Sequence, residues 1–128
     1  MSNVGTLAGH VTVGDRAIVG GLAAVHQFCR IGTMSIIGGC SKVVQDVPPY
    51  MMVDGNPAAT RTLNKEGLKR NGVDEDTQKS MRQAYRILFR REQSFTNAVG
   101  QVRSDVATSP ELEHLLSFIE SSERGIAK

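Results

Sequence analysis

Large apolar residues recur every six positions through the first 47 residues of the chain. Counted from the N-terminus, the first place of every hexad is apolar: Met1, Leu7, Val13, Val19, Val25, Ile31, Ile37 and Val43. The fifth place holds small residues, in order Gly5, Val11, Ala17, Ala23, Cys29, Ser35, Ser41 and Val47. The second place is glycine in four hexads, at Gly14, Gly20, Gly32 and Gly38. A helix repeats its apolar positions about every 3.6 residues and a strand every two, so neither explains this hexapeptide repeat.

A solenoid whose coil has three flat sides does explain a period of six. Each hexad then forms one short strand and one corner, with its first and fifth side chains pointing inward. Three hexads make one coil, and coils stack at the parallel-strand spacing of ~4.8 Å. We expect the second-place glycines to supply unusual backbone dihedral angles at the corners. The pattern resembles that of known hexapeptide-repeat proteins, and this resemblance implies a left-handed parallel β-helix.

The repeat ends at a pair of prolines. Pro48 and Pro49 lack amide donors, so we expect residues 45–50 to close the solenoid. Residues 51–53 can form one last extended segment, ended by a turn at residues 54–57, where Asp, Gly, Asn and Pro follow one another.

Helical patterns follow this turn. The predicted N-caps are, in order, Asn64, Asp74 or Asp76, Ser94 and Ser109. The first helix should end at Arg70, with Gly72 just beyond it, and the second near Arg91. We therefore predict a mixed fold, with a β-helix of hexapeptide repeats over residues 1–58 and a small C-terminal α-helical domain over residues 59–128.

Composition narrows the class of protein. The formal net charge is only +2, which gives no support for a nucleic-acid partner. Cys29 and Cys40 fall at the fifth and fourth places of their hexads, so we expect no disulfide and a reducing compartment. No secretory signal and no apolar run of ~18 residues is present, so we predict a cytoplasmic protein without a membrane span.

The repeat is already in register at Met1, with no polar capping segment before it. Residues 1–47 supply fewer than three coils, whereas solenoids need about three repeats and atypical end units. We therefore expect the chain to be the C-terminal part of a longer protein. The alternative is that assembly covers the open end.

Two histidines of the repeat carry the candidate chemistry. His26 occupies a second-place corner, and His10 lies 16 residues earlier, so both should lie on adjacent coils near one edge and line one cleft. Two surface histidines could also fall there by chance. Gln27 follows His26, and Asn64 and Arg70 come just beyond the predicted coil, which favours a polar site. We predict no metal site, because a clear third ligand is missing.

Several strings together resemble one enzyme family. They are LAGHV at 7–11, AVHQFC at 24–29, IGGCS at 37–41, DVPPY at 46–50, GNP at 55–57 and LNKEGLKR at 63–70. The family is the acyl-[acyl-carrier-protein]–UDP-N-acetylglucosamine O-acyltransferases, which act first in lipid A biosynthesis. The resemblance extends over essentially the whole chain, including Arg124 and Gly125 near its end.

This resemblance implies a homotrimer with active sites between neighbouring subunits. The enzyme would move an (R)-3-hydroxyacyl chain from the thioester of acyl carrier protein to the 3-hydroxyl of UDP-N-acetylglucosamine, with no bound cofactor. A histidine would act as general base on that hydroxyl, and a backbone amide would bind the oxyanion of the tetrahedral intermediate.

The resemblance also implies roles for individual residues. Gly9 resembles the oxyanion-binding residue, Gly39 resembles the residue that limits acyl length, and a glycine there implies a tail nearer fourteen carbons than ten. The residues that resemble substrate-binding positions are His10, His26 and Gln27 for the sugar nucleotide, and Asn64, Glu66 and Arg70 for uridine and diphosphate.

The chain departs from the family pattern in two ways. The family's catalytic histidine lies about one coil before His10, hence before Met1, so we expect this chain alone to lack the general base and to be inactive. Asn71 stands where some members carry a further arginine, which predicts weaker phosphate binding.

Basic residues form a row along one face of the second predicted helix. Lys79, Arg82, Arg86 and Arg90 recur at spacings of three and four, which is usual for a solvated helix face. Acyl carrier protein is acidic and needs a basic docking surface. We therefore predict that Arg82, Arg86 and Arg90 dock it.

Two alternative functions stay open. A related lipid A N-acyltransferase or a coenzyme A-dependent acetyltransferase would share the repeat, but the LNKEGLKR segment and the four helices argue against both. A non-catalytic trimerising module that binds UDP-sugar or acyl carrier protein is favoured by the missing base.

Overall fold

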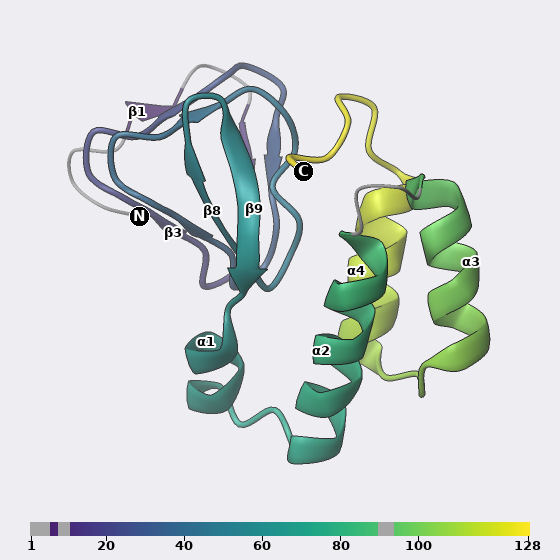
Figure 1. Ribbon diagram of the computed structural model, residues 1–128. Helices are drawn as coiled ribbons and strands as arrows, with labels where there is room; N and C mark the ends of the chain where they lie inside the picture. Colours follow the sequence, from purple (N-terminus) through teal and green to yellow (C-terminus); the bar gives the residue numbers. More distant parts are fainter. Residues whose placement is uncertain (1–5, 8–10, 90–93) are drawn as a thin grey trace.

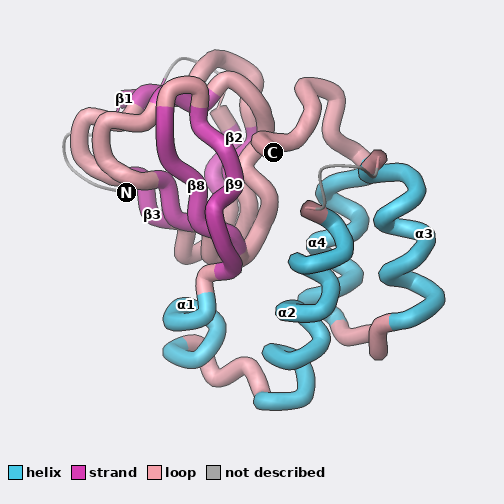
Figure 2. The backbone as a smooth tube through the Cα atoms, in the orientation of Figure 1, coloured by secondary structure: helices cyan, strands magenta, loops and turns pink. Residues whose placement is uncertain are grey.

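A computed structural model describes residues 6–7, 11–89 and 94–128 of the chain. A coil of short strands forms the N-terminal part, and a group of helices lies beside it (Figures 1 and 2). The C-terminus returns from the helices to the coil (Figure 1).

Among the described residues, seven two-residue strands begin six positions apart. They are β1 (Thr6–Leu7), β2 (Thr12–Val13), β3 (Ile18–Val19), β4 (Ala24–Val25), β5 (Arg30–Ile31), β6 (Ile36–Ile37) and β7 (Lys42–Val43). Every third strand pairs in parallel, giving the sheets β1-β4-β7, β2-β5 and β3-β6. Partners such as Val19 and Ile37 are therefore one full coil apart. This register confirms the predicted three-sided coil of three hexads.

The interior of the coil follows the hexad pattern. The first-place residues Val19, Val25, Ile31, Ile37 and Val43 are at most 3% exposed. The fifth-place residues are buried as well, in order Ala17, Ala23, Cys29, Ser35, Ser41 and Val47. The two fifth-place serines satisfy their hydroxyl groups locally, because each hydrogen-bonds the backbone of a nearby glycine.

The role predicted for the second-place glycines was wrong. The left-handed dihedral angles of the corners fall at the fourth place, with φ between 55° and 69°, at Arg16, Leu22, Phe28, Met34 and Cys40. The second-place glycines instead allow adjacent coils to approach. A Cβ on Gly14 would lie 2.6 Å from the amide nitrogen of Thr33, and one on Gly20 would lie 2.7 Å from the amide nitrogen of Gly39. Coil stacking, and not corner geometry, therefore requires glycine there.

The described coil ends in a hairpin. Strand β8 (Met51–Gly55) pairs in parallel with β6, and β9 (Ala58–Leu63) pairs antiparallel with β8. The predicted extended segment and the turn that ends it are confirmed. Strand β9 was not predicted, and all of it except Ala58 lies in the segment that the sequence analysis assigned to the helical domain.

The proline-containing segment forms one more rung before this hairpin. Val47 makes a parallel bridge to Ile31, and the amide of Gly32 donates to the carbonyl of Val47 over 2.9 Å. Pro49 lies close against Gly32, where a Cβ would be 2.3 Å from the proline nitrogen. A proline fits this rung because its nitrogen has no hydrogen to place between the coils.

Four helices follow in the described part of the chain. They are α1 (Lys65–Arg70), α2 (Glu75–Leu88), α3 (Phe95–Asp105) and α4 (Pro110–Glu120). Their N-caps are Asn64, Asp74, Ser94 and Ser109, and each side chain accepts a hydrogen bond from the amide three residues later. These caps confirm the predicted helix starts.

The helices and the end of the coil share one core. Met81, Leu88, Val102, Leu112 and Leu116 fill its centre and are at most 1% exposed. The coil contributes Met34, Tyr50, Met51 and Leu63 to the same cluster. None of the described helices is long and apolar enough to cross a membrane.

We predict that Gly32→Ala lowers the free energy of unfolding by about 3 kcal/mol, because backbone atoms of the next rung cannot move aside for the new Cβ. Gly100→Ala is the matched control. A Cβ there meets open space within α3, so this substitution should raise the free energy of unfolding by about 0.5–1 kcal/mol. Urea unfolding of both variants measures the difference, and equal effects would contradict the stacking constraint.

Candidate functional site

The predicted site residues fall in different parts of the structure. Gly9, His10 and Arg90 lie outside the described residues. The others lie at an outer corner of the coil, on α1 with the loop before it, and on α2. Different contacts hold the residues of each group in place.

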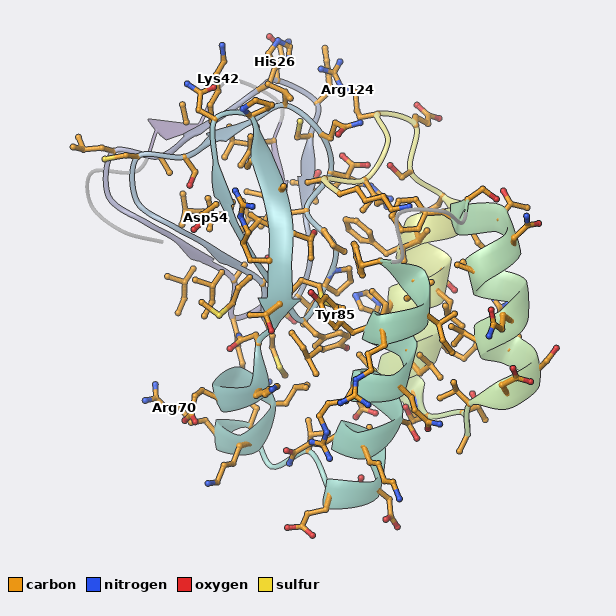
Figure 3. All side chains as sticks on the ribbon, viewed as in Figure 1. His26, Lys42, Asp54, Arg70, Tyr85 and Arg124 are labelled. Carbon is orange, nitrogen blue, oxygen red and sulfur yellow. The ribbon has the colours of Figure 1, made fainter. Side chains whose placement is uncertain are left out.

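His26 stands at the outer corner that follows β4. Its amide donates to the carbonyl of Val43 over 2.8 Å, which fixes the backbone, and its side chain is exposed as predicted. Nδ1 of the ring lies 2.9 Å from Nη2 of Arg124 and 3.1 Å from the carbonyl oxygen of Gln27. Figure 3 shows His26 and Arg124 at the same edge of the molecule. Arg124, 98 residues away in sequence, is a site neighbour that the sequence analysis did not assign.

The C-terminal tail, residues 121–128, brings Arg124 to this corner. Ile126 makes a parallel bridge to Asp46 of the coil. The amide of Asp46 donates to the carbonyl of Gly125 over 2.8 Å, and the amide of Ala127 donates to the carbonyl of Asp46 over 2.9 Å. The tail therefore adds a short strand segment to the edge of the coil.

The carboxylate of Asp46 anchors the tail from inside. Its side chain is 1% exposed and accepts hydrogen bonds from the amide of Arg30 at 2.8 Å and from Oγ of Ser122 at 2.6 Å. The guanidinium of Arg30 lies 3.6 Å from the same carboxylate, donates to the carbonyl of Phe118 and stacks 4.1 Å over its ring. A buried carboxylate is stable when its oxygens are bonded and a cation is near, and Asp46 has both.

A cleft of about 250 Å³ lies between the corner and the tail. Its lining residues are Phe28, Arg30, Asp46, Ser121, Glu123 and Arg124. Arg124 also reaches the thiol of Cys29: burial raises the pKa of this thiol, and the nearby guanidinium partly opposes the shift. Cys29 is buried and Cys40 is exposed, and both are free, as their hexad places predicted.

Asn64, Glu66 and Arg70 lie at α1, away from His26. Figure 3 shows Arg70 and His26 at opposite ends of the molecule. Glu66 and Arg70 are exposed, but Asn64 is 4% exposed. Nδ2 of Asn64 donates to the carbonyl of Met34 over 2.7 Å, and its Oδ1 accepts from the amide of Gly67 at 3.0 Å. One described chain therefore does not bring the two predicted groups together, and Asn64 joins α1 to the coil.

Gly39 occupies an exposed third-place position on the coil. A Cβ there would lie 3.0 Å from the carbonyl oxygen of Gly21 on the adjacent coil. Some other third places hold larger residues, such as Gln27 and Thr33, and Gly21 is also a glycine. The close contact of Gly39 with Gly21 therefore favours glycine at this position.

The basic row of α2 lines a small groove. Arg82 and Arg86 face it together with Lys65 and the end of β9, and the groove measures about 90 Å³. The hydroxyl of Tyr85 forms part of the wall and donates to the carbonyl of Arg61 over 2.8 Å. Three cationic side chains from two helices therefore meet at one place.

Comparison with known proteins places this arrangement in a family. The model of the second domain of UDP-N-acetylglucosamine O-acyltransferases matches residues 46–127, from the buried Asp46 to the tail that it anchors. The chain belongs to this family of O-acyltransferases. Nothing among the described residues forms a group of three potential metal ligands.

Individual O-acyltransferases agree with this assignment. Acyl-[acyl-carrier-protein]–UDP-N-acetylglucosamine O-acyltransferase of Aliivibrio salmonicida is 44% identical over 128 residues, which is 100% of this chain and 49% of the relative. The protein of the same name from Burkholderia lata is 43% identical over 132 residues, covering 100% of this chain and 50% of the relative. The chain spans about half the length of the curated relatives it matches.

Solved structures of the family share the fold. LpxA from Acinetobacter baumannii superimposes with a TM-score of 0.89 at 41% identity, over 95% of this chain and 48% of that one. The UDP-N-acetylglucosamine acyltransferase of Arabidopsis gives a TM-score of 0.87 at 41% identity, over 97% and 47%. The coil, the hairpin and the helices therefore superimpose on these structures as one unit.

We predict that Asp46→Asn loosens the tail. Asparagine keeps the shape but loses the charge and one acceptor, so the free energy of unfolding should fall by about 1.5–3 kcal/mol. Hydrogen exchange of the Ala127 amide should accelerate. The control is Asp54→Asn, which removes an exposed ion pair with Arg61 and should cost less than about 1 kcal/mol. Similar losses in both variants would show that Asp46 is not the anchor.

Proposed function

We propose that the chain is the C-terminal half of an enzyme that transfers an (R)-3-hydroxyacyl chain from acyl carrier protein to the 3-hydroxyl of UDP-N-acetylglucosamine, in the first step of lipid A biosynthesis. The observation that carries the proposal is the match of the family's second domain over residues 46–127. Identities of 43–44% to relatives named for this reaction, over the whole chain, support it.

The proposal includes a left-handed β-helix, with residues 1–58 and 59–128 as its two domains, in a cytoplasmic homotrimer. A TM-score of 0.89 to LpxA supports the fold. The outer face of the β3-β6-β8 sheet supports an assembly, because Ile18 is 51% and Met52 39% exposed there. An apolar face of this kind is stabilised when a neighbouring subunit covers it.

A trimer would also reunite the two separated groups of site residues. In our proposal His26 and Gln27 of one subunit bind the sugar nucleotide, and Glu66 and Arg70 of a neighbour bind uridine and diphosphate. An arginine guanidinium matches the geometry of phosphate oxygens. Both polar atoms of Asn64 are engaged within the fold, which supports a role in placing α1 and not a direct ligand contact.

We propose that the general base of the reaction lies outside this chain. A general base takes the proton of the 3-hydroxyl, the alkoxide oxygen attacks the thioester carbonyl, and the carrier thiol leaves from a tetrahedral intermediate. We propose that the Gly9 amide binds the oxyanion and that His10 lines the sugar site. The thioester supplies the acyl group, so no bound cofactor or metal is needed. The base belongs to a preceding coil, and the chain alone should be inactive.

We predict that the chain binds UDP-N-acetylglucosamine without catalysing transfer. Arg70→Ala should weaken binding roughly tenfold or more, as expected for a lost charged hydrogen bond to phosphate. Arg16→Ala, at an outer corner of the coil, is the control and should leave the affinity unchanged. Calorimetric titration and an acyl-transfer assay measure both points.

Absence of binding would contradict the nucleotide site, and turnover by this chain would contradict the missing base.

The same titration tests Gly39. Gly39 stands at the position proposed to limit the length of the acyl chain. UDP-N-acetylglucosamine acylated with a fourteen-carbon chain should therefore bind more tightly than the form with a ten-carbon chain. A preference for the shorter chain would refute this role.

We further propose that the groove of Arg82, Arg86 and Lys65 docks acyl carrier protein; Arg90, which the sequence analysis also assigned to docking, lies outside the described residues. Its three described cations converge, which supports a binding surface over a merely solvated helix face. Arg82→Glu with Arg86→Glu should reduce affinity for acyl carrier protein more than tenfold and remove its salt dependence. UDP-N-acetylglucosamine affinity should not change. Arg16→Glu controls for net charge, and an equal loss there would contradict a specific docking groove.

A further inference from the structure

The contact between Arg124 and His26 bears on whether Nδ1 of the imidazole donates or accepts a hydrogen bond. An arginine side chain has five N–H donors, no acceptor, and a charge that persists at all ordinary pH values. Nη2 of Arg124 lies 2.9 Å from Nδ1 of His26, so Nδ1 must accept this hydrogen bond. In the neutral ring the single proton then lies on Nε2.

A second neighbour of Nδ1 favours the opposite tautomer. The carbonyl oxygen of Gln27 lies 3.1 Å from the same nitrogen, and a carbonyl oxygen can only accept. A proton on Nδ1 would satisfy Gln27 and leave Arg124 facing an N–H group. The two contacts therefore compete for one nitrogen, and each is satisfied by a different tautomer.

We propose that Arg124 is a positioning residue that holds His26 in the Nε2–H tautomer, so that the exposed ring presents an N–H donor to an oxygen of the sugar nucleotide. The proposal rests on the function proposed above for His26. The hydrogen bond that one ring nitrogen of a histidine makes sets which tautomer the other nitrogen presents.

The tail is built to keep Arg124 in place. The hydrogen bonds of Gly125 and Ala127 to the backbone of Asp46 fix the tail just beyond Arg124, and Ser122 is bonded to the Asp46 carboxylate just before it. Burial raises the pKa of the adjacent Cys29, so at neutral pH this thiol is uncharged and does not hold the guanidinium as a thiolate would. The C-terminal end of the helical part thus acts directly on a corner of the coil.

The test is the tautomer itself, read from ¹⁵N spectra of histidine-labelled full chain at pH 8. The His26 signals are assigned by their loss in His26→Gln. The wild type should carry its proton on Nε2. Arg124→Met should move the proton toward Nδ1, where the Gln27 carbonyl accepts it. Arg124→Lys should retain the wild-type tautomer, because an ammonium group also only donates. Arg16→Met is the matched control and should change nothing.

A wild-type proton on Nδ1 would overturn the proposal, and so would an unchanged tautomer in Arg124→Met. Protection of the Ala127 amide in each variant shows whether the tail is still in place. If the tail detaches in Arg124→Met, the tautomers of the wild type and of Arg124→Lys still test the proposal.

Binding provides a readout that a purely structural role would not give. Arg124→Met should weaken UDP-N-acetylglucosamine binding about fivefold, the usual worth of one hydrogen bond, and should have no further effect in a His26→Gln background. Additive losses would mean that Arg124 does not act through His26. A chain with the expected tautomer that binds no UDP-N-acetylglucosamine would refute the proposed function and leave the tautomer result intact.

Discussion

The close approach of successive coils is the constraint on which the whole structure depends. Rungs lie so close together at several corners that there is no room for a side chain at Gly14, Gly20 or Gly32. Fourth-place residues meanwhile hold left-handed dihedral angles that are unfavourable for an L-residue in isolation. They are held there because backbone bonds on both sides fix the corner, as when the amides of Met34 and Cys40 donate to the coil before. The repeat is thus stable as a stack and not as single hexads.

The helical part is joined to this stack at two separate places. At one end Asn64 ties the start of α1 to the carbonyl of Met34, and Tyr50 and Met51 enter the helical core. At the other end the tail returns to Asp46, after a chain segment of more than fifty residues that includes α2, α3 and α4. The helical segment is thus attached to the coil at both ends. This is the physical link between the two parts of the molecule.

Local patterns in the sequence predicted much of this fold. The period of six gave the coil because every hexad carries its own inward residues, and the four helix caps were readable because each cap bonds an amide three residues away. Strand β9 was missed because its residues, AATRTL, show no clear apolar alternation and depend on pairing with β8. The glycines were misinterpreted because a sequence shows that a side chain is absent but not which neighbour excludes it. Arg124 could not be placed beside His26, since nothing local links residues so far apart, and Gly9 and His10 stay untested.

The hairpin of β8 and β9 limits the end-to-end association of copies of this chain. A stack of parallel rungs has no natural end, and its last edge offers free amide and carbonyl groups to any similar strand. Strand β9 reverses direction, so the edge it presents has the wrong polarity for another parallel rung. On a second face, the pairing of Ile126 with Asp46 covers the edge with the chain's own terminus. These two closures would keep copies from joining end to end into fibres at this end of the coil.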